Sequence, residues 1–194
     1  MCGRYYIPDE DSAEELRVII EEVNRKSVEN PVKTGEIAPT DTAPVIANSR
    51  SLEPTPFAMK WGYTLPNGKL VFNTRSETAV SKPMFKEGMT QRRCLVPAGH
   101  YYEWEKRGRE KIKYSIGRNE RGIIFMAGIY RLENGKPVFS VLTREPAAQI
   151  AFIHDRMPVI LPVEATKDWL NTRYAPEDVL KAAWLDVSFE PEHG

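Results

Sequence analysis

The chain has 194 residues, enough for one domain, and its 27 Lys and Arg residues balance its 27 Asp and Glu residues. Zero net charge argues against a nonspecific duplex-coating protein, because such proteins carry a basic excess. The two cysteines, Cys2 and Cys94, provide neither a disulfide framework nor a metal-binding cysteine pattern.

The chain shows no signal for export or membrane insertion. It becomes charged by residue 9 without the apolar stretch of a signal peptide. No apolar run of about 18 residues occurs, so we expect no transmembrane segment. With reduced thiols, these features predict a cytoplasmic protein.

The first element predicted is an amphipathic helix over residues 12–25. Ser12 and Glu15 form a capping box at its start. Apolar residues then recur at helical spacing, at Leu16, Ile19, Ile20 and Val23.

Most of the remaining chain has a strand pattern. Asn67-Gly68 and Asn134-Gly135 lie between strand-like runs and predict hairpin turns. The predicted strands cover 43–48, 55–63, 69–73, 93–106, 111–117, 123–132, 138–144, 157–162 and 184–189; the predicted short helices cover 146–153, 164–171 and 176–184.

The predicted strands follow one another and do not alternate with long helices. This order indicates an α+β fold with a curved, mainly antiparallel β-sheet flanked by short helices. We find no repeat, linker or low-complexity segment. The sequence therefore predicts a single domain over residues 1–194.

Cys2 is the first candidate catalytic residue. Removal of Met1 would give it a free α-amine of pKa about 7.7–8.0 beside a nucleophilic thiol. The amine can form an imine with an aldehyde, and the thiol can then close a five-membered thiazolidine. The alternative is that Cys2 is an accidental small residue near a frayed terminus and takes no part in chemistry.

Glu103 and His154 are candidates for proton transfer. Period-two alternation places Tyr102 and Trp104 on one strand face and Glu103 on the other. If the aromatic face packs inward, Glu103 would look into a cleft behind it; otherwise it is a solvated strand glutamate. His154 precedes Asp155 and Arg156 in a loop, where it is either a proton shuttle or a structural histidine.

Asn73, Arg75 and Trp61 are candidates for substrate binding. Asn73 and Arg75 could orient a substrate and clamp a phosphate, or Asn73 could simply cap a helix. Trp61 could stack on a base or lie in the core. The sequence has no glycine-rich phosphate loop and no HExxH, CxxC or GxSxG motif.

Taken together, the motifs resemble the SOS-response-associated peptidase (SRAP) family of abasic-site processing proteins from residue 2 to about 162. Each motif is weak alone, and their joint order makes the likeness specific. They are Cys2-Gly-Arg-Tyr, Ala38-Pro39-Thr40, Trp61-Gly62, Asn73-Thr-Arg-Ser-Glu-Thr78, Arg93-Cys-Leu-Val-Pro-Ala98, Tyr102-Glu103-Trp104, Thr143 and His154-Asp-Arg-Met-Pro158.

The resemblance implies a barrel-like sheet and a thiazolidine crosslink to abasic sites in single-stranded DNA. By the same resemblance, Cys2 is the nucleophile and Glu103 the acid or base. His154 assists sugar-ring opening and crosslink reversal, and Asn73 holds the reacting terminus. The implied DNA-binding residues are Arg4, Pro39, Trp61, Arg75, Thr143 and Arg156.

The resemblance also implies removal of Met1, from which the peptidase name derives, and a lyase-like activity. No cofactor or metal is expected, and the protein is expected to be a monomer that joins the nucleoid on damaged DNA. One departure from the family pattern is Gly99-His100-Tyr101, which stands where Asp-Gly-Phe is usual.

Two other functions are compatible with the sequence, one through Cys2 and one through its aromatic residues. An N-terminal-nucleophile amidohydrolase would use the Cys2 amine as base and cleave an amide. A noncatalytic reader of single-stranded or modified DNA would not need Cys2.

Overall fold

The computed structural model describes residues 2–8, 14–26, 31–118 and 122–192. Helix α1 (Glu14–Lys26) overlaps the predicted helix 12–25, ends one residue beyond it and buries Leu16, Ile20 and Val23. The capping box predicted at Ser12 lies outside the described residues.

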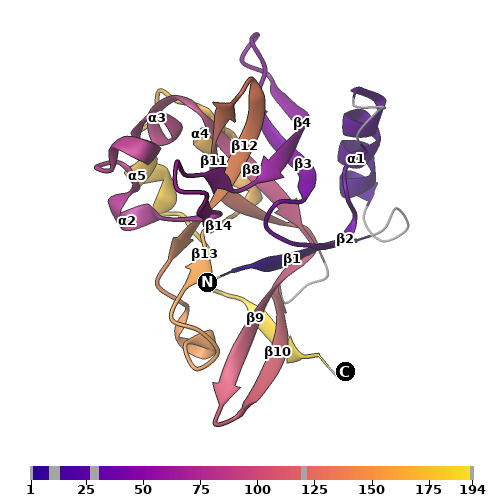
Figure 1. Ribbon diagram of the computed structural model, residues 1–194, viewed down its shortest axis with the longest axis vertical. Helices are drawn as coiled ribbons and strands as arrows, with labels where there is room; N and C mark the ends of the chain where they lie inside the picture. Colours follow the sequence, from indigo (N-terminus) through magenta and orange to yellow (C-terminus); the bar gives the residue numbers. More distant parts are fainter. Residues whose placement is uncertain (1, 9–13, 27–30, 119–121, 193–194) are drawn as a thin grey trace.

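Five strands pair in a ring and form a closed barrel (Figure 1). Neighbouring strands are antiparallel, except β4 and β12, which run parallel. A closed ring has no free edge, and successive side chains point alternately into and out of the barrel. The barrel strands are β3 (Thr42–Asn48), β4 (Pro54–Trp61), β8 (Arg93–Ala98), β11 (Ile124–Glu133) and β12 (Lys136–Arg144).

Short strands extend the barrel, and two more form a separate hairpin. Strand β7 pairs in parallel with the carboxyl-terminal half of β12, which brings residues 73–75 to that end of the barrel. These strands are β5 (Tyr63–Thr64), β6 (Leu70–Val71), β7 (Asn73–Arg75), β13 (Met157–Pro158) and β14 (Ile160–Leu161).

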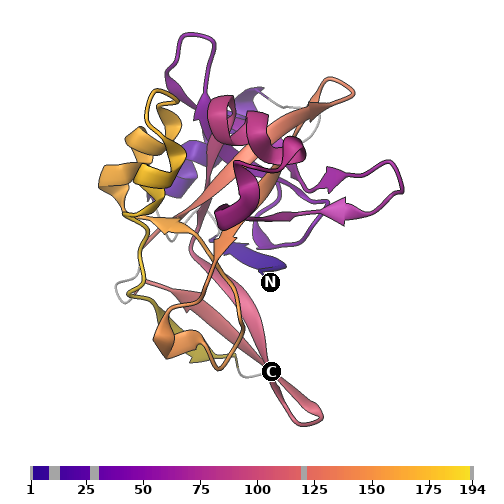
Figure 2. The same cartoon turned by 90° about the vertical axis from the view of Figure 1, so that its left-hand side faces the viewer.

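A second, antiparallel sheet has the strand order β15-β10-β9-β1-β2. Its β9–β10 hairpin extends away from the barrel (Figures 1 and 2). The strands are β1 (Arg4–Ile7), β2 (Gly35–Ile37), β9 (His100–Arg107), β10 (Glu110–Gly117) and β15 (Ser188–Pro191).

Gly99 carries the chain from the barrel into this second sheet. Its N–H donates to the Tyr6 carbonyl at 2.8 Å, and a Cβ at Gly99 would lie 3.0 Å from Pro8 Cγ. The close approach of the two backbones therefore divides the predicted strand 93–106 into β8 and β9.

Most helices gather on one side of the barrel (Figure 2). Their apolar residues and the outward-facing residues of the barrel form a second core, which includes Met89, Ile129 and Trp169. The helices on this side are α2 (Ser76–Ala79), α3 (Pro83–Gln91), α4 (Val163–Leu170) and α5 (Pro176–Leu180).

The α+β class and the curved, mainly antiparallel sheet predicted from the sequence are confirmed. Several short elements differ. The predicted helix 146–153 contains only a 3₁₀ turn, η1 (Ala148–Ile150), and the predicted helix 176–184 ends at Leu180. The last strand begins four residues later than predicted, at Ser188. Strands β1 and β2 and helices α2 and α3 were not predicted.

Across the residues that the structure describes, no helix has the length and apolar character needed to cross a membrane.

Arg93 links three parts of this architecture and generates a stability prediction. Its guanidinium donates to the carbonyls of Met89, Trp169 and Tyr174 at 2.6, 3.4 and 2.8 Å. We expect Arg93→Met to lower the free energy of unfolding by about 2–4 kcal/mol, because buried carbonyls lose charged donors. Urea denaturation measures the change.

The matched control is Arg107→Met, because the Arg107 side chain is largely exposed. Its effect should stay within about 0.5 kcal/mol. Equal losses in the two variants would contradict the structural role assigned to Arg93.

Candidate active site at the amino-terminal strand

Strand β1 holds Cys2 at one end of the barrel. The strand pairs on both sides, with Tyr5 opposite Ile37 of β2 and Tyr101 of β9. The Asn73 side-chain amide donates to the Cys2 carbonyl at 2.7 Å. Cys2 is 0% exposed and belongs to the apolar core cluster. It is therefore an ordered core residue, and the alternative of a frayed terminus is wrong.

The Cys2 thiol is protonated in this environment. Burial is the largest cause that raises its pKa, and the nearby charge of Glu103 raises it further. The thiol lies 3.6 Å from the Arg4 carbonyl. In the chain that still carries Met1, the Cys2 nitrogen is a peptide nitrogen, so the aminothiol does not yet exist.

Glu103 faces the interior from β9. It is 3% exposed, and burial raises the pKa of its carboxyl group above the ordinary value. The alternation predicted along this strand is present, but the face that packs inward carries Tyr101 and Glu103. Trp104 lies on the outer face, where the Lys113 ammonium approaches the rings of Tyr102 and Trp104. Glu103 is therefore buried without the inward aromatic face that the sequence analysis gave as a condition, and the alternative of a solvated glutamate is wrong.

His154 follows the 3₁₀ turn after β12. Its Nδ1 accepts the Arg156 backbone N–H at 3.1 Å and lies 2.7 Å from the Asp155 carboxylate. Burial lowers the pKa of its imidazole, and Asp155 opposes this effect. Asp155 is 81% exposed on its side chain, so water screens the pair. The Arg156 N–H requires a lone pair on Nδ1, whereas the Asp155 carboxylate favours a proton there. Burial, the largest cause of the lowered pKa, favours the neutral imidazole.

Arg156 is fixed by an ion pair that the sequence analysis missed. Its guanidinium donates to both Glu77 carboxylate oxygens at 2.8 Å and to the Thr143 carbonyl at 2.6 Å. Such a bidentate arrangement is strong and directional. The sequence signal for Glu77 was its place in the Asn73–Thr78 motif, but its partner is 79 residues away.

Several buried polar atoms near Cys2 have no hydrogen-bond partner within the described ranges. They are the hydroxyls of Tyr5 and Tyr101 and the side-chain oxygen of Asn73. Burial is the largest cause that raises both phenol pKa values, and a thiolate at Cys2 would raise them further. Buried polar groups are usually paired, so a water molecule or a polar ligand would satisfy these atoms.

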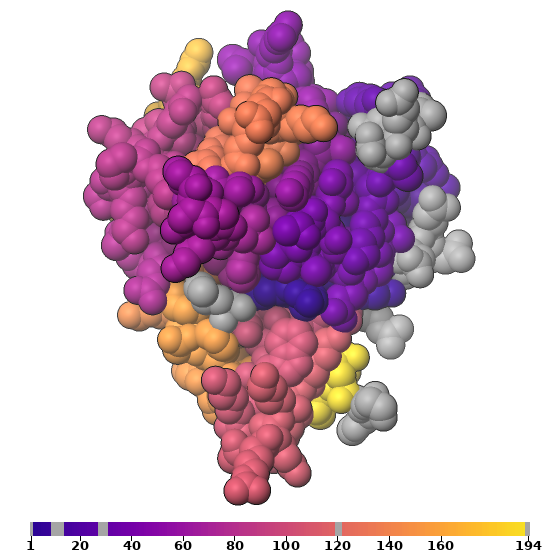
Figure 3. All heavy atoms as spheres, viewed as in Figure 1, coloured from indigo at the N-terminus to yellow at the C-terminus, as the bar shows by residue number. Residues whose placement is uncertain are grey.

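The predicted DNA-binding residues differ in their accessibility. Arg75 is exposed and Pro39 is half-buried. Arg4 is half-buried, and its Nε donates to Glu36 at 3.1 Å. Figure 3 shows this amino-terminal segment between the barrel and the β9–β10 hairpin.

Trp61 and Thr143 are fully buried. The Trp61 indole N–H donates to the Phe72 carbonyl at 2.8 Å, and its ring stacks on Phe139. The prediction that these two side chains form a surface for bases is wrong for this structure, because neither reaches solvent. Trp61 is a core residue, and Thr143 supports Arg156.

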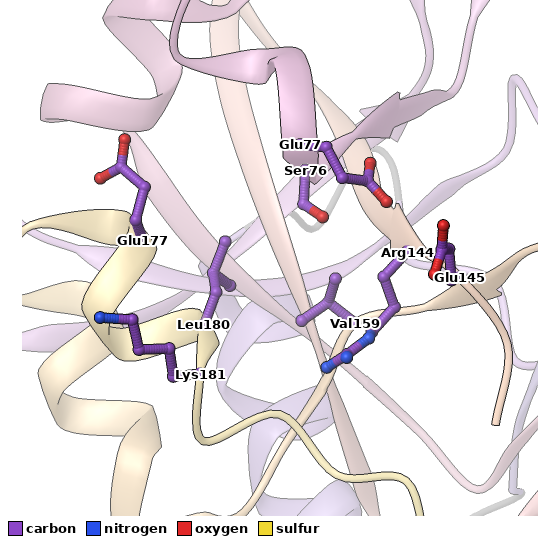
Figure 4. Close-up of a pocket in the computed structure, with 8 residues that line it drawn as sticks. All are labelled: Ser76, Glu77, Arg144, Glu145, Val159, Glu177, Leu180 and Lys181. Carbon is purple, nitrogen blue, oxygen red and sulfur yellow. The ribbon is translucent and has the colours of Figure 1, made fainter.

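A pocket of about 580 Å³ lies beside the Arg156–Glu77 pair (Figure 4). Val159 and Leu180 contribute apolar surface to it. Three carboxylates and two cations share its walls, so it offers no excess positive charge for a phosphate. The charged lining residues are Glu77, Arg144, Glu145, Glu177 and Lys181.

The fold and site together define an α+β barrel protein whose first strand presents a buried cysteine to a glutamate and an asparagine. The sequence profile described as SOS response associated peptidase (SRAP) matches residues 1–190. The chain belongs to the SRAP family.

Two curated relatives cover most of the chain. Abasic site processing protein YoqW from Bacillus subtilis is 30% identical over 94% of this chain and 85% of its own. Abasic site processing protein YobE from the same organism is 30% identical over 95% of this chain and 89% of its own.

A crystal structure of a Bacteroides thetaiotaomicron protein has the same fold. Its TM-score is 0.79 at 23% identity, with 99% of this chain and 92% of the other covered.

The burial of Glu103 generates a prediction for stability against pH. A raised pKa in the folded state means that ionisation opposes folding as the pH rises above the ordinary value of 4.5. Glu103→Gln mimics the protonated form, so this variant should be more stable than wild type at pH 7. Urea denaturation across pH measures the difference.

Below the ordinary glutamate pKa, both folded and unfolded wild type are protonated, and the difference should disappear. The control Glu53→Gln alters an exposed glutamate and should match wild type at every pH. Destabilisation of Glu103→Gln at pH 7 would contradict the prediction.

Proposed function

We propose that this protein processes abasic sites in single-stranded DNA by forming a thiazolidine crosslink through Cys2. The names of its curated relatives support the general activity. The observation that carries the specific chemistry is the hydrogen bond from Asn73 to the Cys2 carbonyl at 2.7 Å. This bond holds the backbone of the second residue beside a buried carboxyl group.

The reaction needs the amine of Cys2, so hydrolysis of the Met1–Cys2 peptide bond comes first. The amine then adds to the aldehyde carbon of the ring-opened sugar, and loss of water gives an imine. The thiol sulfur adds to the imine carbon, and its proton goes to the nitrogen. The resulting thiazolidine joins protein and DNA without net oxidation or reduction.

Glu103 and His154 suit the proton transfers in these steps. A buried carboxyl with a raised pKa keeps its proton at higher pH, so Glu103 can protonate the departing hydroxyl. A histidine with a lowered pKa stays neutral and can accept a proton. We propose that His154 removes the proton from the sugar hydroxyl, and that this deprotonation opens the ring. Opposite pKa shifts in two titratable groups of one site are a common basis for such roles.

The unpaired hydroxyls of Tyr5 and Tyr101 support a hydroxyl-bearing ligand. An abasic sugar offers hydroxyl and carbonyl groups that can bond to them. Tyr101 stands where the family pattern usually has Phe, so its hydroxyl is a local feature of this chain.

DNA contacts are proposed for Arg75, Arg4, Arg156 and Pro39. Arg75 is the best placed for a phosphate, because it is exposed and makes no ion pair within the described part of the chain. To contact a phosphate, Arg156 would have to break its ion pair with Glu77. Otherwise it would contribute by fixing the positions of neighbouring residues. We further propose a monomer that removes its own Met1, has a lyase-like activity and associates with the nucleoid on damaged DNA.

Intact-protein mass spectrometry tests the crosslink. Mixing the protein with an abasic single-stranded oligonucleotide should give a heat-stable adduct on a chain that lacks Met1. Cys2→Ala should abolish the adduct, because the thiazolidine ring cannot close without the sulfur of Cys2. Cys94→Ala is the matched control, because Cys94 is an equally buried cysteine distant from β1 in the sequence.

Other outcomes would identify the competing functions. Turnover of a small amide without a DNA adduct would support the N-terminal amidohydrolase. Equal DNA binding by wild type and Cys2→Ala, with Met1 retained and no adduct, would support a noncatalytic DNA reader.

Noncovalent binding tests Arg75. In a Cys2→Ala background, Arg75→Ala should weaken binding to an abasic oligonucleotide. It should also reduce the slope of log affinity against log salt by about 0.7, the value for one phosphate contact on a single strand. Fluorescence anisotropy over a salt series measures both.

Arg17→Ala is the matched control, because Arg17 lies on α1 and pairs with Glu21. An unchanged salt slope for Arg75→Ala would remove Arg75 from the DNA interface.

A further inference from the structure

The barrel opens into an apolar pocket of about 740 Å³ at the end away from Cys2. Asn73, which binds the Cys2 carbonyl, pairs with Val141 near the carboxyl end of β12, whereas Pro137 at the amino end of β12 lines the pocket. Barrel mouths are frequent ligand sites, and this volume lies in the usual range of about 300–1,000 Å³. Its apolar lining consists of Ala47, Phe57, Met59, Tyr130, Leu132 and Pro137.

Two hairpin turns form the rim of this pocket. The β3–β4 and β11–β12 turns reach the same end of the molecule (Figures 1 and 2). Each hairpin exposes a leucine: Leu52 in the β3–β4 turn is 70% exposed, and Leu132 near the end of β11 is 54% exposed. Exposed leucines beside an apolar pocket enlarge its apolar surface, as expected of a protein contact.

The β3–β4 turn is also held in an unfavourable conformation. Leu52 has a φ of 63°, in the left-handed region that non-glycine residues rarely adopt. The Ser49 backbone N–H donates to the Glu53 carbonyl, and its own carbonyl accepts the Leu52 N–H. These bonds keep the exposed leucine in one orientation, and strain retained by such bonds is characteristic of functional surfaces.

The charged residues that line the pocket are both cations. Arg50 and Arg92 line it, and no carboxylate does. Arg50 makes no ion pair within the described ranges, and Arg92 pairs only with the exposed Glu87, at 3.1 Å. Lys26 lies over the Phe57 ring, 5.9 Å from its centre. An apolar wall with cations at its rim complements a ligand that is both apolar and acidic.

We propose that this pocket docks an acidic peptide segment of a partner protein, with apolar side chains inserted between the two hairpins. A peptide fits better than a nucleic acid, because the wall is apolar and only two guanidinium groups line it. The inference is independent of the chemistry at Cys2. Since the pocket lies at the other end of the barrel, a partner could bind while the site is engaged with DNA.

The test begins with an array of short synthetic peptides in which paired Leu or Phe residues are flanked by Asp and Glu. A second array replaces the acidic residues with Lys and Arg. The full-length protein should bind members of the first array and not the second. Arg50→Glu should weaken the strongest peptide by about tenfold or more, because an attractive charge contact becomes repulsive.

Arg50→Lys keeps the positive charge and should lose less affinity. Arg17→Glu reverses a charge on the exposed side of α1 and should bind as wild type does. Both Arg50 and Arg17 are exposed, so these substitutions leave the core unchanged.

Methionine methyl NMR locates the bound peptide. Met59 lines the pocket, whereas Met89 lies in the core beneath the helices. The strongest acidic peptide should shift the Met59 methyl signal and leave that of Met89 unchanged.

Four results would overturn the proposal: no binder in the acidic array, equal binding of the basic array, no effect of Arg50→Glu, or no shift at Met59. A shift of Met59 by an undamaged oligonucleotide that competes with the peptide would also overturn it, in favour of a nucleic-acid surface.

Discussion

The site depends on the pairing of β1 with strands on both of its sides. A chain end held by one strand would fray, because its backbone groups could exchange freely with water. Here β1 lies between β2 and β9, and Asn73 holds the carbonyl of Cys2 just before the strand begins. This arrangement turns the second residue of the chain into a buried, oriented group. The position of Glu103 follows from the same pairing, because β9 carries it.

Closure of the barrel places different groups of residues at its two ends. Strand β12 brings β7 and Asn73 to one end, where β1 supplies Cys2. Its other end meets the apolar pocket between the hairpins. Because side chains alternate along each strand, one set fills the barrel and the other packs under the helices. The proposed reaction site and the proposed docking surface therefore use different residues at opposite ends of the barrel.

The electrostatics of the site are local. The chain has no net charge, yet it buries the Glu103 carboxyl and an Arg156 guanidinium that pairs with the exposed Glu77. A buried carboxylate opposes folding at neutral pH, and the proposed role of Glu103 in proton transfer would account for its retention. The Arg156 ion pair fixes the backbone next to His154. Under the proposed function, an exposed Arg75 and a covalent bond would provide DNA attachment without a strong overall positive charge.

The sequence by itself determined the α+β class, the positions of the longer strands, and the turn at Asn134-Gly135, where both residues have positive φ. These features depend on local periodicity and on backbone preferences. It did not determine β1, because four residues carry too little periodicity. Which face of β9 packs inward, and which partner holds Arg156, were decided only by the tertiary structure. Both depend on contacts between segments far apart in the chain, which no local pattern records.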